Sequence, residues 1–289
     1  MAFAFAGQRA LIYGAAKGIG QAVALEFARR GANVAVADID IEAAEATAAQ
    51  IRAVGREAVA VRCDVTDDAD VARGGAAAEA ALGEADIVMN NVGGIIGGDP
   101  QDIPLDEWRR LIDLNLMSVI RGQQAFLPKM LARGDGYLVN TASFAGLYPY
   151  AVSRLPYAAS KAAVIALTEG LALYAEPRGV RVSCLCPGPV KTGIGANMKN
   201  WTPDGPMRGP GRQYQFVTPA ECATILADGM ERGRLIIPTD EQVWEDIRSH
   251  AASPDDFVRR KIAIEASRDF GLPEGFTPPG ALPTHDGSP

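Results

Sequence analysis

Short runs of β-branched and other apolar residues alternate with alanine-rich stretches of helical period along most of this 289-residue chain. Apolar runs of this kind, separated by helices, are typical of parallel strands that are buried on both faces. The alternation therefore predicts an α/β fold with one doubly wound parallel sheet. The seven predicted strands are residues 9–13, 33–37, 57–62, 86–89, 136–140, 181–185 and 234–237.

The stretches between these strands predict six helices. Pro128 lies inside the fourth of them, and an internal proline removes a backbone hydrogen bond, so we expect that helix to be kinked or split. The six helices are residues 18–30, 41–54, 68–82, 105–133, 157–176 and 218–231.

The length suits one large domain, because a single core stops growing at roughly 250 to 300 residues. We assign residues 1–240 to this domain, followed by a helical extension at 241–270 and a Pro/Gly-rich tail or docking arm at 271–289. Within the domain, residues 193–216 combine glycines and prolines with bulky side chains and predict a mobile substrate lid. The bulky residues of this segment are Met198, Trp201, Met207 and Tyr214.

Charge and composition exclude several classes of function. A net charge of −7 argues against nucleic acid as a partner, which needs a concentrated basic surface. The two histidines, His250 and His285, lie beyond the motifs described below, which argues against a Ser-His-Asp hydrolase or a zinc site. We expect no membrane span, because no apolar run approaches the 18 or more residues that a membrane-spanning helix needs. The N-terminus does not resemble a secretion signal, so we expect a cytoplasmic protein.

Four cysteines match neither a disulfide framework nor a CxxC metal site. Cys184 and Cys186 alternate along one predicted strand, so both face one side of the sheet. We expect reduced core thiols at Cys63, Cys184, Cys186 and Cys222; a redox pair at 184 and 186 is the alternative.

A glycine-rich turn follows the first predicted strand directly and leads into the first helix. Glycines let a backbone turn tightly and approach a pyrophosphate, and a helix N-terminus offers free N–H donors to an anion. A purely structural loop uses the same residues, but the position between strand and helix favours a dinucleotide site. The predicted cofactor-binding residues of this turn are Gly14, Lys17, Gly18, Ile19 and Gly20.

Two carboxylates follow the next two strands. Asp38 lies where the ribose hydroxyls of a dinucleotide are expected, and its charge favours NAD over NADP; the alternatives are a solvated turn residue and a 2′-phosphate contact from Lys17. Asp64 and Val65 follow the third strand, where we expect the adenine. A helix N-cap is the alternative role of Asp64.

Tyr157 and Lys161 are four residues apart in a helical pattern and share one helix face. A tyrosine has a pKa of about 10, so activity at neutral pH requires stabilisation of the phenolate. The Lys161 ammonium and an oxidised nicotinamide are the expected sources. The pair alone is also common on ordinary amphipathic helices.

Taken together, these motifs resemble the short-chain dehydrogenase/reductase superfamily over about residues 5–238. The motifs that carry the resemblance are Gly14 to Gly20, Asn90-Asn91-Val92-Gly93, Asn115, Ser143, Tyr157, Lys161 and Pro187-Gly188. The resemblance implies a Rossmann fold and reversible hydride transfer between NAD and a secondary alcohol or ketone. It also implies a homo-oligomer, either a dimer or a tetramer.

The resemblance assigns roles to individual residues. Ser143 hydrogen-bonds the substrate oxygen and Tyr157 transfers the proton. Lys161 holds the nicotinamide ribose and lowers the pKa of Tyr157, and Asn115 holds a water in the proton relay. Thr192 contacts the nicotinamide carboxamide. The cofactor contacts that the resemblance adds are Asn91, Pro187, Gly188, Val190 and Thr192.

Residues 144–156, which include Tyr148, Tyr150 and Arg154, are expected to line the substrate pocket, and their aromatic content predicts a bulky small-molecule substrate. The charged C-terminal extension is similar to that of dehydrogenases acting on large aromatic alcohols such as lignin-derived aryl ethers. An epimerase or lyase of the same superfamily that retains its NAD is the alternative activity, and a non-catalytic NAD-sensing protein is a third possibility.

Overall fold

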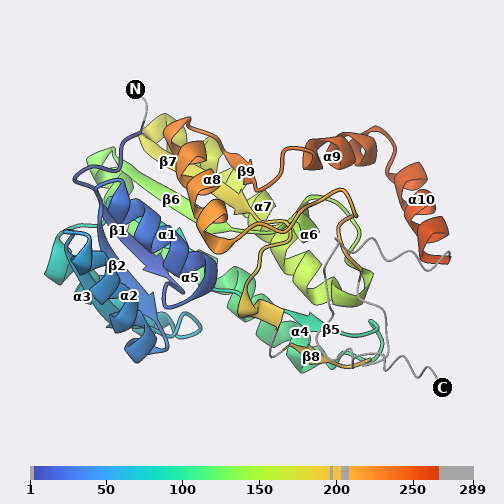
Figure 1. Ribbon diagram of the computed structural model, residues 1–289, viewed down its shortest axis with the longest axis horizontal. Coiled ribbons are helices and arrows are strands. Elements are labelled where there is room, and N and C mark those ends of the chain that lie inside the picture. The colour runs from blue at the N-terminus through green and yellow to red at the C-terminus, as the bar shows by residue number, and fades with distance from the viewer. Residues whose placement is uncertain (1–2, 196–197, 203–207, 267–289) are drawn as a thin grey trace, which may run out of the picture.

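The computed structural model describes residues 3–195, 198–202 and 208–266, so the predicted tail at 271–289 lies outside the described residues. Seven parallel strands form one sheet in the order β3-β2-β1-β4-β6-β7-β9 (Figure 1). Each strand overlaps a predicted one, so the doubly wound sheet is confirmed. The strands are β1 (Arg9–Tyr13), β2 (Asn33–Asp38), β3 (Ala58–Arg62), β4 (Ile87–Asn90), β6 (Gly136–Thr141), β7 (Val180–Cys186) and β9 (Ile236–Pro238).

Helices cover both faces of this sheet, because successive side chains of a strand point to opposite sides. Ile12 and Val36 belong to the core beneath α1, α2 and α8, whereas Leu11 and Ala35 belong to the core beneath α3, α5 and α7. The helices are α1 (Gly18–Arg29), α2 (Ile41–Ala53), α3 (Asp68–Leu82), α5 (Ser118–Arg133), α7 (Leu155–Ala175) and α8 (Pro219–Glu231).

The predicted helix 105–133 is irregular, but not at its proline. It consists of α4 (Leu105–Ile112), a π-helical segment at Asp113–Met117 and α5, which continues through Pro128. The irregularity lies where the side chain of Asn115 leaves the helix to bond the backbone of Gly94. The predicted interruption is therefore present, but it coincides with a contact between distant parts of the chain and not with Pro128.

A second, two-stranded sheet pairs β5 (Ile96–Gly97) with β8 (Lys199–Asn200). This pairing brings the described part of the predicted lid beside the segment that follows β4. Trp201 of that part donates its backbone N–H to Gly97 and is 39% exposed. Met207, another residue of the predicted lid, lies outside the described residues.

The C-terminal extension forms two helices, α9 (Val243–Ala252) and α10 (Pro254–Ala266). They pack on a cluster of buried residues in which Tyr214 is fully enclosed, so Tyr214 is an interior residue and not an exposed contact of a lid. The Tyr214 hydroxyl donates to Asp246 of α9 at 2.6 Å. The buried members of this aromatic cluster are Phe144, Tyr148, Tyr214, Val243 and Phe257.

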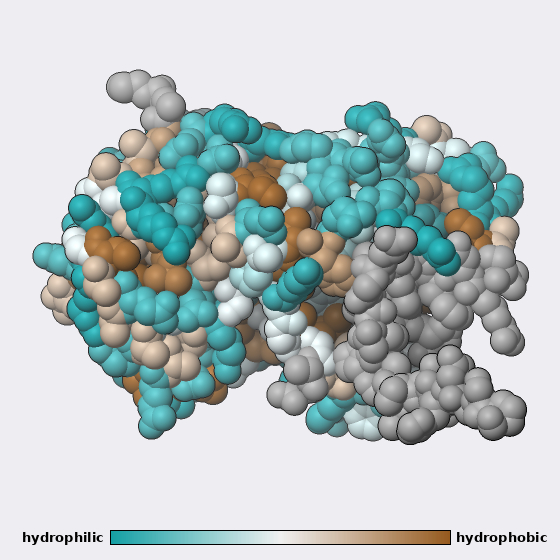
Figure 2. Space-filling model, viewed as in Figure 1, coloured by the Kyte–Doolittle hydropathy of each residue, from teal (hydrophilic) through white to brown (hydrophobic). Residues whose placement is uncertain are grey.

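The four cysteines are buried free thiols, as predicted. The sulfur atoms of Cys184 and Cys186 lie 3.8 Å apart on one side of β7. On the face shown in Figure 2, hydrophilic residues cover much of the surface and hydrophobic residues gather in its hollowed middle.

Among the described residues, the stretch Val152–Arg178 is long and apolar enough to cross a membrane, with a mean hydropathy of 1.2 over its best window. The expectation that no stretch comes near this limit was therefore too strict. Most of the stretch is α7, whose buried residues, among them Val164 and Leu171, pack into the domain core. Its apolar character is accounted for by that packing.

Candidate active site

The glycine-rich turn has the geometry that its sequence predicts. Gly14 and Gly18 have φ angles of 72° and 62°, in the left-handed region that favours glycine. Ile19 packs against the main core, whereas the Lys17 side chain is 77% exposed. Helix α1 begins after Lys17 without a side-chain cap and has no acidic residue in its first turn. Its N-terminal N–H groups therefore face the turn as an anion site.

Gly20 is required for a different reason, because other atoms approach its Cα too closely to leave room for a side chain. A Cβ atom at Gly20 would lie 2.0 Å from the Gly14 carbonyl oxygen and 2.6 Å from Nδ2 of Asn91. That Nδ2 donates to the Gly14 carbonyl at 3.0 Å, and Oδ1 of Asn91 accepts from the Thr141 hydroxyl at 3.2 Å. Asn91 thus ties the turn to the ends of β4 and β6.

Asp38 ends β2 beside this turn. Its Oδ2 accepts from the backbone N–H of Ala16 at 3.0 Å, and its Oδ1 accepts from the backbone N–H of Asp40 at 3.1 Å. Each oxygen retains acceptor capacity toward a hydroxyl group. Lys17 instead pairs with Asp40 at 3.7 Å on the surface. The residues present therefore fit the pyrophosphate and ribose of a dinucleotide.

Asp64 and Val65 follow β3, and Val65 is buried. The Asp64 carboxylate accepts from the backbone and hydroxyl of Thr66 at 2.9 and 2.7 Å, and these bonds hold the pKa of Asp64 below its usual value. The N-cap of α3 is Asp67, which accepts from Asp70 at 2.7 Å. The alternative role of Asp64 as N-cap is therefore wrong, and its contact with adenine stays a prediction.

The segment after β7 approaches the turn from the other side. Gly188 lies against the ring of Phe144, where a Cβ would come within 2.7 Å, and its N–H donates to Thr239. Pro187 is buried, and Val190 forms an isolated parallel bridge to residue 217. A Cβ at Gly18 would lie 3.9 Å from Cγ2 of Thr192, so the predicted contact residue is brought beside the turn.

The predicted catalytic residues come from three elements. Ser143 follows β6 and caps the short helix α6 (Phe144–Leu147), accepting from Ala145 at 3.2 Å. Tyr157 and Lys161 lie one turn apart on α7, with Lys161 Nζ 5.9 Å from the Tyr157 ring centre. Lys161 is 3% exposed and donates to the Thr141 carbonyl at 2.8 Å.

Asn115 is fully buried, and its amide is engaged on both sides. Oδ1 accepts from the N–H of Gly94 at 2.8 Å, and Nδ2 donates to the Gly94 carbonyl and to Ser160, each at 3.0 Å. The Ser160 hydroxyl in turn donates to the Tyr157 carbonyl at 2.8 Å. Asn115 therefore connects the loop after β4 to the helix that carries Tyr157 and Lys161.

Burial and neighbouring groups shift the pKa values of Tyr157 and Lys161. Burial is the largest influence on Tyr157 and raises its pKa, whereas a hydrogen bond with Ser143 and the charge of Arg154 lower it. Burial lowers the pKa of Lys161 to about 8. Arg154 is thus a cation that lowers the pKa of Tyr157, whereas Lys161 donates to the Thr141 carbonyl. The effect of Lys161 on the pKa of Tyr157 stays a prediction.

Sequence analysis missed the residues that hold the catalytic groups in place. Thr141, at the end of β6, anchors both Lys161 and Asn91, and its position at the carboxyl end of a strand was an available signal. Gly94 and Ser160 act through contacts that no local pattern reveals. Arg154 was assigned only to the pocket wall.

The sheet, the glycine turn and the Ser–Tyr–Lys group at the carboxyl ends of its strands define a Rossmann-type oxidoreductase. A sequence profile described as short chain dehydrogenase matches residues 8–203. The chain belongs to the short-chain dehydrogenase family, as its motifs predict.

Individual relatives agree with this family. The chain is 37% identical over 198 residues to 2,5-dichloro-2,5-cyclohexadiene-1,4-diol dehydrogenase LinX of Sphingobium indicum, covering 68% of this chain and 79% of that protein. A short-chain dehydrogenase/reductase from Burkholderia phymatum in complex with NAD superposes with a TM-score of 0.75 at 30% identity, covering 95% of this chain and all of the other. LigD from Sphingobium sp. strain SYK-6 superposes with a TM-score of 0.72 at 30% identity, covering 87% and 97%.

Proposed function

We propose that this protein interconverts secondary alcohols and ketones with NAD as the hydride carrier and Tyr157 as the acid/base. The observation that carries the proposal is the meeting of Ser143, Tyr157 and Lys161 at the strand ends that also carry the glycine turn. A phenol, a hydroxyl and an amine at one place are suited to moving a proton at a carbinol oxygen.

A bound NAD supplies the position that accepts or gives up the hydride. The N-terminus of α1 would hold the pyrophosphate, and Asp38 would accept hydrogen bonds from the adenosine ribose. The complex of the Burkholderia phymatum relative with NAD supports this choice of cofactor. Asp38 supports NAD over NADP, because its charge repels a 2′-phosphate.

Proton transfer falls to residues of this chain. The Ser143 hydroxyl donates to the substrate oxygen, and the Tyr157 hydroxyl gives or takes its proton. Lys161 places a cation beside the reacting groups, and its depressed pKa of about 8 lets it exchange protons near neutrality. Asn115 fixes the loop and helix around these groups, and its Oδ1 retains one acceptor position for the proposed water relay.

We propose a bulky, largely apolar substrate. Burial raises the pKa of Tyr150, and the neighbouring Tyr157 raises it further. The Tyr150 ring lies 5.1 Å from that of Tyr148. The segment between Ser143 and Tyr157 thus offers aromatic surface near the reacting oxygen. The dehydrogenase activity of LinX on a cyclic diol supports an alcohol as substrate.

The proposed function is tested by following NADH fluorescence with aryl and alicyclic secondary alcohols and the matching ketones. We expect reversible turnover with NAD and much weaker turnover with NADP. NAD that stays bound while a product forms without any change in NADH would instead support an epimerase or lyase. Binding of NADH without turnover of any alcohol or ketone would contradict the proposal.

Replacing Asp38 with Ser is expected to shift the preference for NADH over NADPH by about 10- to 100-fold toward NADPH, because a repulsive charge and an acceptor are removed. The ratio of kcat/KM values for the two cofactors measures this shift. Asp106→Ser, at a carboxylate on the surface of α4, is the matched control and should leave the ratio unchanged. An unchanged ratio in Asp38→Ser would contradict the role of Asp38.

A further inference from the structure

Arg154 is a cation beside the proposed active site that the proposed mechanism does not use. It immediately precedes α7, three residues before Tyr157, and its Nη2 donates to the carbonyl of Arg208. The guanidinium carbon lies 6.0 Å from the ring centre of Tyr150. Backbone and ring contacts therefore orient the guanidinium without neutralising it.

The polar requirements of Arg154 are not met within the described part of the chain. Its Nε is buried and has no hydrogen-bond partner there. No carboxylate of the described residues forms an ion pair with it, although most other arginines near the surface have one. A buried guanidinium N–H without an acceptor is unfavourable, and an incoming anion satisfies it.

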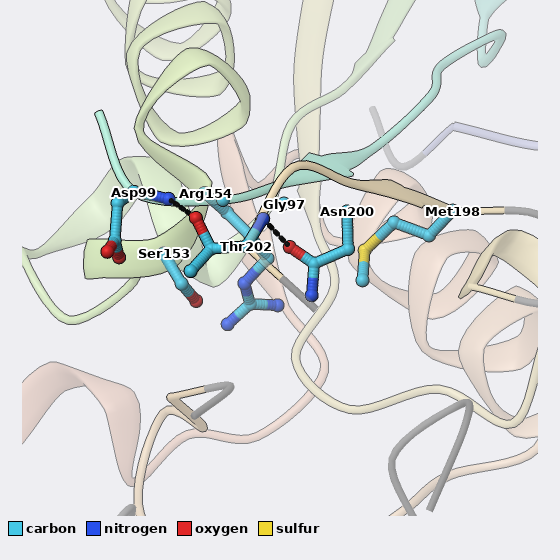
Figure 3. A pocket seen from close by; sticks show the side chains of 8 residues that line it. Gly97, Asp99, Ser153, Arg154, Met198, Asn200 and Thr202 are labelled. Atoms are coloured by element: carbon cyan, nitrogen blue, oxygen red, sulfur yellow. Dashed lines mark hydrogen bonds between the residues drawn. The ribbon is translucent and has the colours of Figure 1, made fainter. Parts of the chain in front are cut away.

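Arg154 borders a small cavity between the start of α7 and the two-stranded sheet. The cavity, of about 10 Å³, is roughly the size of one water molecule or one carboxylate oxygen. Figure 3 shows Arg154 and Ser153 beside Gly97 of β5, with Asn200 and Met198 of the β8 segment across from them. Ile96, which precedes Gly97, belongs to the apolar cluster against which Tyr157 packs. Arg154 thus borders the cavity at the start of the helix that carries Tyr157 one turn further on.

Asp99, the acidic residue among those that line the cavity, does not pair with Arg154. Asp99 is exposed, and its backbone N–H donates to the Thr202 hydroxyl at 2.9 Å (Figure 3). Its carboxylate makes no ion pair with Arg154 among the described contacts. The charge of Arg154 also reaches the catalytic group, since it lowers the pKa of Tyr157.

We propose that Arg154 binds a carboxylate of the substrate, so that the preferred substrates are hydroxy acids or keto acids in which an apolar body separates the carboxylate from the reacting carbon. This inference rests on the proposed function and deepens it by naming a substrate class. Arginine suits the role, because its planar donors match a carboxylate and its charge is permanent.

The test compares 4-(1-hydroxyethyl)benzoate with its methyl ester, which differ in the charge at the end remote from the alcohol. In the unaltered protein we expect a lower KM for the acid than for the ester. Arg154→Gln should raise the KM for the acid by about 10- to 100-fold, the size of a lost charge-assisted hydrogen bond, and change the KM for the ester far less. Because Arg154 also lowers the pKa of Tyr157, any loss of kcat should be shared by the two substrates. Arg154→Lys should recover part of the loss.

Arg109→Gln, on the exposed face of α4, is the matched control and should leave the KM for both substrates unchanged. Turnover of the ester by Arg154→Gln shows that the variant is folded. An equal rise in KM for acid and ester, or a native protein that prefers the ester, would overturn the role of Arg154 while leaving the proposed function in place. Failure of the native protein to oxidise either compound or any neutral alcohol would overturn the proposed function itself.

Discussion

Replacing Tyr157 with Phe is expected to lower kcat by about 10²- to 10⁴-fold, because the variant lacks the hydroxyl that gives and takes the proton. The ring contacts with the cluster around Ile96 remain, so the fold should be unaffected. The affinity for NADH, measured by fluorescence titration, should change little, since the glycine turn and Asp38 are intact. Stopped-flow measurement of NADH formation separates the chemical step from product release.

Tyr174→Phe is the matched control, because this tyrosine lies on the same helix but is 50% exposed and contacts Arg178. It should retain full activity. If Tyr157→Phe turned over substrate at the native rate, another group would have to supply the proton. If it lost NADH binding as well, Tyr157 would have a structural role in the cofactor site.

Replacing Gly20 with Ala is expected to weaken NADH binding by about two orders of magnitude or more, because the added Cβ cannot fit without moving the turn. The Cβ would lie 2.0 Å from the Gly14 carbonyl and 2.6 Å from Nδ2 of Asn91, so both ends of the cradle must shift. The dissociation constant for NADH and the melting temperature, measured together, separate loss of the site from loss of the fold.

Gly170→Ala provides the comparison for this prediction. Gly170 lies within α7, and a Cβ there meets no atom within 4 Å. Alanine should therefore be neutral or stabilise the helix by up to about 1 kcal/mol. A Gly20→Ala variant that binds NADH as tightly as Gly170→Ala would show that the turn does not hold the cofactor.

The sheet was predictable because parallel strands buried on both faces are written as continuous apolar runs. The strand of residues 33–38, all apolar between Asn33 and Asp38, is an example. The two-residue strands β5 and β8 were not, because two residues carry no period. The interruption of the helix predicted at residues 105–133 was expected at Pro128, but α5 continues through this proline. The interruption coincides instead with the contact between Asn115 and Gly94, which no local rule reveals.

The site residues were predictable as types in an order along the chain, but their mutual arrangement was not. Nothing near Asn115 in the sequence indicates that its amide meets Gly94 and Ser160. Likewise, the spacing of Tyr157 and Lys161 placed both on one face but did not show that the amine turns to the Thr141 carbonyl. Such contacts depend on distances between elements that the folded sheet alone determines.

The enclosed ring of Tyr214 limits how this protein could be re-engineered. Its ring packs edge-on against Phe144, which directly follows Ser143. Its hydroxyl donates to Asp246 of α9. Nearby, the Tyr148 hydroxyl donates to the Pro210 carbonyl. These bonds join three stretches of chain that are far apart in sequence. A chimera that takes only α9 and α10 from a relative would remove side chains that cover Tyr214. The segments around Phe144, Tyr214 and α9 must therefore be exchanged together.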